Sequence, residues 1–187
     1  MRFLKIISFM ACLTFFHPNV YAPPVAPSLR EEAERVGILV GVGVEPINLT
    51  EEAFVTALVQ NFNMVEPENA MKWSAIRPNR HSFRFDGGDQ VVAFARAHGM
   101  KVRGHNLAWG HANPAWLSQG QFTPRQLSKL LREHITRVVG HYRGQVFAWD
   151  VVNEAFEDGG KTKSSIWYDQ PGIGLAGKKT AWIERAF

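Results

Sequence analysis

Apolar and polar positions alternate in blocks along the chain. Residues 37–44 form an apolar, β-branched run that predicts a buried strand. Further runs at 62–65, 100–107 and 145–152 predict three more strands. The long polar stretch at 66–88 is predicted to be loop.

Helices are predicted between and beyond these strands, at 29–36, 51–60, 90–98, 124–142 and 178–187. Thr50 and Asp89 are the candidate caps of the second and third helices, and Gly99 is the expected C′ residue of the third. The fourth helix has the clearest start, because Thr123 and Gln126 form a capping box with Pro124 at the first helical position.

This alternation of strands and helices predicts an α/β fold with a parallel sheet and helices packed outside it. Two architectures fit, an open doubly wound sheet and a (β/α)₈ TIM barrel. A doubly wound nucleotide-binding sheet needs a glycine-rich turn after an early strand. The segment 41–45 lacks the third glycine of that turn, and Pro46 stands where a helix would begin, so the pattern argues against a nucleotide site.

Residues 1–22 differ from the rest of the chain. Two basic residues precede an apolar stretch at 6–16, and Val20 to Ala22 has the small-x-small pattern of a cleavage site, so a signal peptide is predicted. The stretch is too short for a membrane span, and no later apolar segment reaches the required length of about 20 residues. We expect a secreted or periplasmic protein, with a proline-rich leader at 23–28.

Charge and cysteine content narrow the function. The one cysteine, Cys12, lies in the predicted signal, so an exported chain has no disulfide, thiolate nucleophile or cysteine–zinc site. Removing residues 1–22 also lowers the net charge from +4 to +2. A net charge this small gives only weak support to a nucleic-acid partner. Four lysines are predicted to be solvated loop charges: Lys161, Lys163, Lys178 and Lys179.

Candidate chemistry lies just past the strand ends, where parallel α/β folds place their sites. Polar side chains and tryptophans recur there: Glu68, Asn69, Lys72 and Trp73; His105, Asn106, Trp109, His111 and Trp116; Asn153, Glu154 and Phe156. Indole faces pack on sugar rings, and the polar groups bind hydroxyls. Each residue alone has an ordinary structural explanation, and their recurrence at three strand ends predicts a carbohydrate site.

Glu154 is the strongest single candidate. Its carboxyl lies at a strand end beside aromatic rings, and loss of hydration there raises a carboxyl pKa toward that of a proton donor. The amide of Asn153 can hold a sugar hydroxyl. A metal site from His105, His111 and Glu154 is a weaker alternative, because the sequence has no His-Glu-x-x-His. It also has no Gly-x-Ser-x-Gly nucleophile elbow.

Three stretches, 67–73, 102–109 and 149–156, together resemble glycoside hydrolase family 10, the retaining endo-β-1,4-xylanases. The resemblance implies a (β/α)₈ barrel, with Glu154 as general acid/base and Asn153 as its neighbour on the sugar. It also implies a xylan or xylo-oligosaccharide substrate, no cofactor and no metal. The residues expected to line the cleft are Glu68, Asn69, Lys72, His105 and Trp109.

The sequence departs from the family pattern in places. Gly110 stands where the family has histidine, and Glu66 stands where threonine is common. A complete barrel needs roughly 250 residues, so 29–187 is expected to be its first four βα units, without the glutamate nucleophile. We expect little activity from such a chain. A non-catalytic xylan-binding half-barrel and a different β-glycanase are the alternatives.

Overall fold

The structure, a computed structural model, describes residues 26–167 of the 187-residue chain. Its elements follow in the order α1 (Leu29–Arg35), β1 (Gly41–Val44), η1 (Pro46–Thr50), α2 (Glu52–Asn61), β2 (Met64–Pro67), α3 (Trp73–Ile76), α4 (Asp86–Ala97), β3 (Lys101–Trp109), α5 (Ala115–Ser118), α6 (Pro124–His141) and β4 (Ala148–Asn153). The predicted signal peptide and the predicted helix at 178–187 lie outside the described residues and stay predictions.

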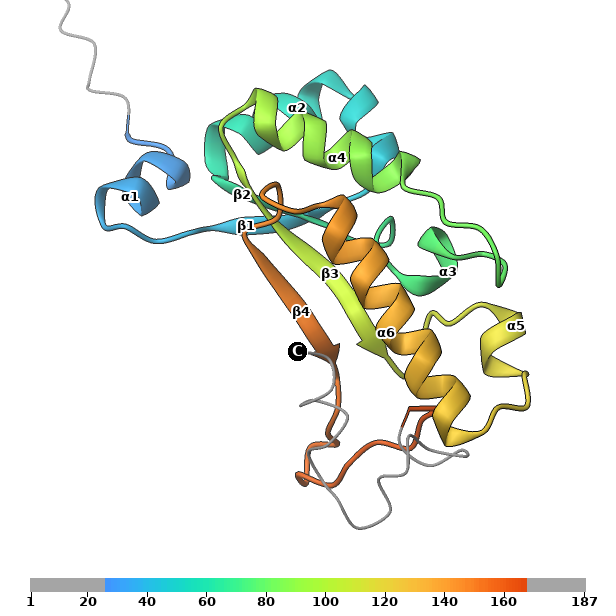
Figure 1. The fold of residues 1–187 in the computed structure, drawn as a ribbon. Helices are drawn as coiled ribbons and strands as arrows, with labels where there is room; N and C mark the ends of the chain where they lie inside the picture. The colour runs from blue at the N-terminus through green and yellow to red at the C-terminus, as the bar shows by residue number, and fades with distance from the viewer. Residues whose placement is uncertain (1–25, 168–187) are drawn as a thin grey trace, which may run out of the picture.

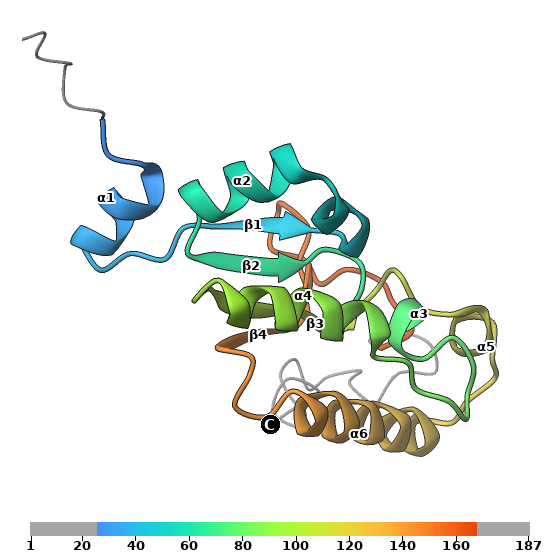
Figure 2. The ribbon, with the colours of Figure 1, turned by 90° about the horizontal axis from the view of Figure 1, so that it is seen from above.

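The four strands form one sheet in the order β1-β2-β3-β4, and every neighbouring pair is parallel. The predicted alternation and the parallel sheet are therefore confirmed. A doubly wound sheet reverses its strand order at a switch point, whereas this order follows the chain, as in a barrel. Helices α2, α4 and α6 pack along one side of the curved sheet (Figure 1), and α1 and α5 lie at opposite ends (Figures 1 and 2).

The core lies between the strands and these helices. Val65 of β2 and Val102 of β3 are buried there against Val138 of α6 and other apolar side chains. Successive strand side chains point to opposite faces, so Glu66 and Arg103 point away from the helices. The sheet therefore has an apolar outer face and a charged inner face. Among the described residues no helix is both long and apolar enough to cross a membrane.

The predicted start of α6 is confirmed in detail. Thr123 Oγ1 accepts a hydrogen bond from the backbone N–H of Gln126 at 3.3 Å, and Gln126 Oε1 accepts from the backbone N–H of Thr123 at 2.8 Å. Pro124 takes the first helical position. Gly99 also has the positive φ of 64° expected of a C′ residue after α4.

The predicted caps of the other two helices are wrong. Thr50 ends the 3₁₀ helix η1, and its hydroxyl donates to the carbonyl of Ile47 at 2.7 Å, so it does not cap α2. Asp89 lies inside α4, which begins at Asp86, and its carboxylate contacts His141 Nε2 at 2.7 Å. In both cases the side chain that was expected to cap the helix contacts a different group instead.

The predicted strand boundaries are shifted by up to four residues. The first strand begins only at Gly41 and lies at the edge of the described sheet, so Ile38 is 59% exposed rather than buried. The second strand includes Glu66 and Pro67, which were expected in the loop. The third continues to Trp109. The short helix α3 occupies part of the segment predicted as loop, and α5 lies where no element was predicted.

Candidate functional site

The predicted site residues gather at the carboxyl edge of the sheet. Val44 pairs with Pro67 at the ends of β1 and β2, and Trp109 pairs with Asn153 at the ends of β3 and β4. The side chains that follow these positions therefore come from different loops to one edge. This is the edge at which parallel α/β folds place their sites.

A chain of contacts joins three of these strand ends. The Asn69 amide donates to the carboxylate of Glu45, which follows β1. Lys72 Nζ donates to Asn69 Oδ1 at 2.6 Å and lies 5.1 Å from the ring centroid of Trp109. Asn69, Lys72 and Trp109 thus form one continuous rim. Glu45 was not predicted as a site residue. It lies directly after the first strand, and a position just after a strand is what identified the predicted site residues.

Glu68 lies beside the end of β1 rather than in this chain of contacts. Its backbone N–H donates to the carbonyl of Val44 at 3.1 Å. A Cβ placed on Gly43 would lie 3.6 Å from the Glu68 side chain, which is itself exposed. The Glu68 side chain therefore lies beside the carboxyl end of β1, next to the rim.

His105 belongs to a charged cluster on the inner face of the sheet. Its Nδ1 lies 2.9 Å from Asp150 Oδ2, and Arg103 donates two hydrogen bonds to Asp150 Oδ1, at 2.9 and 2.5 Å. Glu66 completes the cluster at 3.7 Å from Arg103 and 3.8 Å from His105. Asp150 raises the pKa of the Arg103 guanidinium, which keeps its full charge.

This cluster is also the place among the described residues where a cation site can be considered. Ligand atoms of Glu66, His105 and Asp150 all lie within 4.8 Å of one another, and these donor types suit a divalent metal. The Arg103 guanidinium already contacts both carboxylates, however, and supplies the compensating charge. We therefore assign the cluster as an ion-pair network that fixes the His105 ring. The sequence had offered His105, His111 and Glu154 as possible metal ligands. Among the described residues it is Glu66 and Asp150 that lie close to His105 instead.

Glu154 follows β4 with a positive φ of 49°, and its side chain is 47% exposed. Lys163 Nζ lies 3.1 Å from Glu154 Oε2. This hydrogen bond is the main cause that lowers the pKa of Glu154, with a further contribution from the indole of Trp109. The prediction of a raised pKa is wrong for this arrangement, because the carboxyl keeps its hydration and gains a cation.

Lys163 reaches Glu154 through a short hairpin, so its prediction as a solvated loop charge is also wrong. Phe156 and Thr162 form an antiparallel bridge, and the backbone N–H of Lys163 donates to the carbonyl of Ala155 at 2.9 Å. Gly160 turns the chain with a φ of 76°. The run Asp-Gly-Gly at 158–160 is a hairpin signal that predicts this turn.

Two tryptophans near the site have different environments. Trp73 is 1% exposed and donates to the carbonyl of Leu107 at 2.7 Å, so its indole belongs to the core and offers no face to a sugar. Trp109 is partly buried and lines a small depression together with Asn153, Glu154 and Lys163. Its indole nitrogen is buried and has no hydrogen-bond partner within residues 26–167.

Comparisons with known proteins agree on one family. The sequence profile described as Glycosyl hydrolase family 10 matches residues 28–187. A beta-1,4-xylanase of Dictyoglomus thermophilum is 39% identical over 186 residues, which are 97% of this chain and 51% of that protein. Endo-1,4-beta-xylanase C of Phanerodontia chrysosporium is 39% identical over 153 residues, which are 80% of this chain and 38% of that protein.

The solved structures give the same result for the fold. Xylanase 10B from Thermotoga petrophila, solved in complex with xylobiose, superposes with a TM-score of 0.78 at 34% identity and covers 87% of this chain and 48% of that one. This chain therefore spans about half of that structure, and 38–51% of the length of the curated relatives described above. The described sheet is the corresponding part of a (β/α)₈ barrel.

Proposed function

Because the chain belongs to glycosyl hydrolase family 10, we propose that it functions in the hydrolysis of internal β-1,4-xylosidic bonds of xylan with retention, with Glu154 as general acid/base. One observation carries this proposal. Glu154 and Asn153 lie in the same small depression as Trp109, whose ring is covered by Lys72. One carboxyl of the pair that glycoside cleavage uses thus lies beside an aromatic ring and hydroxyl-binding groups.

The general acid must hold a proton when the leaving oxygen departs. In this structure the Lys163 contact favours the ionised carboxylate of Glu154. A sugar bound between the two side chains separates them and removes hydration, and both changes raise the pKa of the carboxyl. We therefore expect substrate binding itself to prepare Glu154 for the acid step.

The other rim residues bind rather than react. The Lys72 ammonium and the Asn69 amide contact each other and are able to exchange that contact for sugar hydroxyls. His105 is held by Asp150 at Nδ1, while Nε2 lies 3.3 Å from the amide of its neighbour Asn106. The imidazole is therefore fixed in orientation before a substrate arrives.

A retaining mechanism needs a second carboxyl about 5–5.5 Å from the first. Three acids lie within four residues of Glu154, and each has another position: Asp150 pairs with Arg103, and Glu157 and Asp158 lie in the hairpin. We propose that residues 26–167 do not contain the nucleophile and that the 187 residues alone hydrolyse xylan slowly or not at all. Full xylanase activity of the purified chain contradicts this proposal.

The acid/base role is tested by joining the 187 residues to the carboxyl-terminal half of a family 10 xylanase, which supplies a nucleophile. E154Q is expected to abolish turnover of aryl xylobiosides with poor leaving groups and to spare the first step with good ones, since acid assistance matters less there. E157Q is the matched control and keeps its activity on both. Equal loss of E154Q on both substrates excludes the acid role.

The alternative function is a xylan-binding half-barrel without catalysis. Retention of the purified chain on insoluble xylan, together with an inactive fusion, favours that alternative.

We also propose that the protein is exported to the periplasm or the medium, because residues 1–22 have the pattern of a signal peptide. Mass spectrometry of the exported protein is expected to find a new amino terminus near Pro23.

A further inference from the structure

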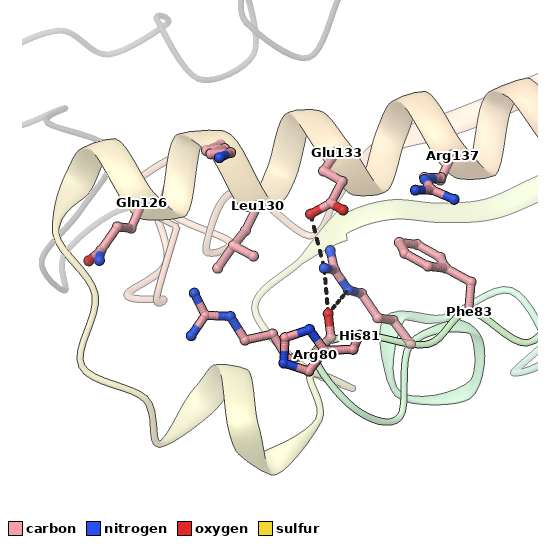
Figure 3. Close-up of a pocket in the computed structure, with 9 residues that line it drawn as sticks. Arg80, His81, Phe83, Gln126, Leu130, Glu133 and Arg137 are labelled. Atoms are coloured by element: carbon pink, nitrogen blue, oxygen red, sulfur yellow. Dashed lines mark hydrogen bonds and ion pairs between the residues drawn. The ribbon is translucent and has the colours of Figure 1, made fainter.

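A basic pocket lies outside the sheet, between α6 and the loop after α3 (Figure 3). It has a volume of about 660 Å³. In Figure 3, Gln126, Leu130, Glu133 and Arg137 follow one another along α6, with Arg80 and His81 on the facing loop. Its charged and titratable lining residues are Arg77, Arg80, His81, Lys129, Glu133 and Arg137. Four permanent cations thus face one carboxylate, although the whole chain has a net charge of only +4.

The floor of the pocket is a fixed guanidinium. The Arg77 side chain is only 3% exposed and donates to Glu133 at 3.0 Å and to the carbonyl of Arg80 at 2.7 and 3.2 Å. Its Cζ lies 4.7 Å from the ring centroid of Phe83 and 5.3 Å from that of Trp116. Its Nη1 is buried and has no hydrogen-bond partner among the described residues. The site therefore holds a positive charge whose donors are incompletely used.

Three exposed cations stand around this floor. Lys129, Glu133 and Arg137 are spaced four residues apart, so they share one face of α6. Lys129 and Arg137 are exposed, as is Arg80 on the facing loop. Glu133 is already paired with Arg77, and these three cations have no ion pair within residues 26–167. Like charges gathered around a concave site repel one another, and a bound anion removes that repulsion.

We propose that this pocket binds the carboxylate of an acidic sugar. Guanidinium groups match the two oxygens of a carboxylate, and the Gln126 side chain adds an amide that suits the hydroxyls of a saccharide. Lys72 and Arg77 flank the short helix α3, so this helix connects the site to the pocket. The choice of a sugar rests on the proposed function, whereas the anion site does not.

The test is calorimetric titration of the purified protein with a trimer of galacturonic acid, with neutral xylotriose and sodium sulfate at matched ionic strength as comparisons. The acidic trimer is expected to bind this pocket. R80Q and R137Q are each expected to weaken it about ten-fold, which corresponds to about 1.4 kcal/mol. R132Q is the matched control, because Arg132 is exposed on α6 but does not line the pocket, and its affinity is expected to be unchanged.

Three results overturn the proposal. Equal weakening by R132Q shows attraction to net charge rather than a site. Sulfate that binds as tightly as the trimer shows an unspecific anion site, and tighter binding of a DNA oligonucleotide shows a different class of ligand. The titration measures binding and not turnover. A negative titration therefore does not affect the proposed hydrolase function, and an inactive fusion does not affect an anion site that the titration detects.

Discussion

The buried imidazole of His134 makes the stability of the protein sensitive to pH. His134 is fully buried in α6 and stacks on Trp73, with 3.7 Å between ring centroids and 16° between ring planes. Neither ring nitrogen has a hydrogen-bond partner among the described residues. Burial, assisted by the charge of Arg77, holds the pKa of His134 well below its ordinary value. The folded protein therefore keeps this ring neutral.

The size and sign of the effect follow from proton linkage. The unfolded chain binds a proton at this histidine below about pH 6.5, and the folded chain does not, so acid favours the unfolded state. For an unfolded pKa of about 6.5, the free energy of unfolding falls by about 1.4 kcal/mol between pH 7.5 and pH 5.5 through this one group. Carboxylates change stability over the same range, so the comparison must be made between variants.

The assay is urea unfolding of wild type, H134F and H81Q at pH 7.5 and pH 5.5, followed by tryptophan fluorescence. Phenylalanine keeps a flat ring against Trp73 but cannot be protonated, so H134F is expected to lose about 1.4 kcal/mol less than wild type on acidification. His81 is exposed, and H81Q is expected to behave like wild type. The same pH dependence in H134F and wild type refutes a buried neutral imidazole.

Three further predictions concern packing, capping and the site. A Cβ on Gly104 would lie 2.3 Å from an indole carbon of β4, so G104A is expected to lose about 1–3 kcal/mol of stability. A Cβ on Gly140 of α6 would meet nothing within 4 Å, so G140A is expected to gain up to about 1 kcal/mol of stability. Urea midpoints that rank the two variants in the opposite order contradict this packing. T123A removes the cap of α6 and is expected to cost about 1 kcal/mol and to speed amide exchange in the first turn, and unchanged exchange there argues against the capping role of Thr123. K163Q is expected to raise the pKa of Glu154 toward its ordinary value in a carbon-13 NMR titration, and an unmoved pKa excludes the lysine as the cause.

Local signals in the sequence predicted the elements that local interactions determine. The capping box of α6 was found because Thr123 and Gln126 satisfy each other within one helical turn. The caps assigned to Thr50 and Asp89 failed because their side chains have other partners. The partner of Asp89, His141, lies 52 residues away along the chain, and a local pattern cannot show it.

The site was predictable to the extent that strand ends define it. Lys72, Trp109 and Glu154 were all identified from their positions after apolar runs, and the parallel sheet brings those positions to one edge. The electrostatics were not predictable in the same way. The pKa of Glu154 depends on Lys163, whose position is set by a hairpin rather than by a strand.

The contacts between Glu45, Asn69 and Lys72 also affect how this protein can be engineered. Glu45 lies after β1, whereas Asn69 and Lys72 both lie after β2. The hydrogen bonds between them make the conformations of these two segments depend on each other. Replacing the segment after β1 with one that has no carboxylate at position 45 leaves the Asn69 amide without this acceptor. Substitutions at these three residues should therefore be non-additive in double-mutant cycles, and their loops should be exchanged together.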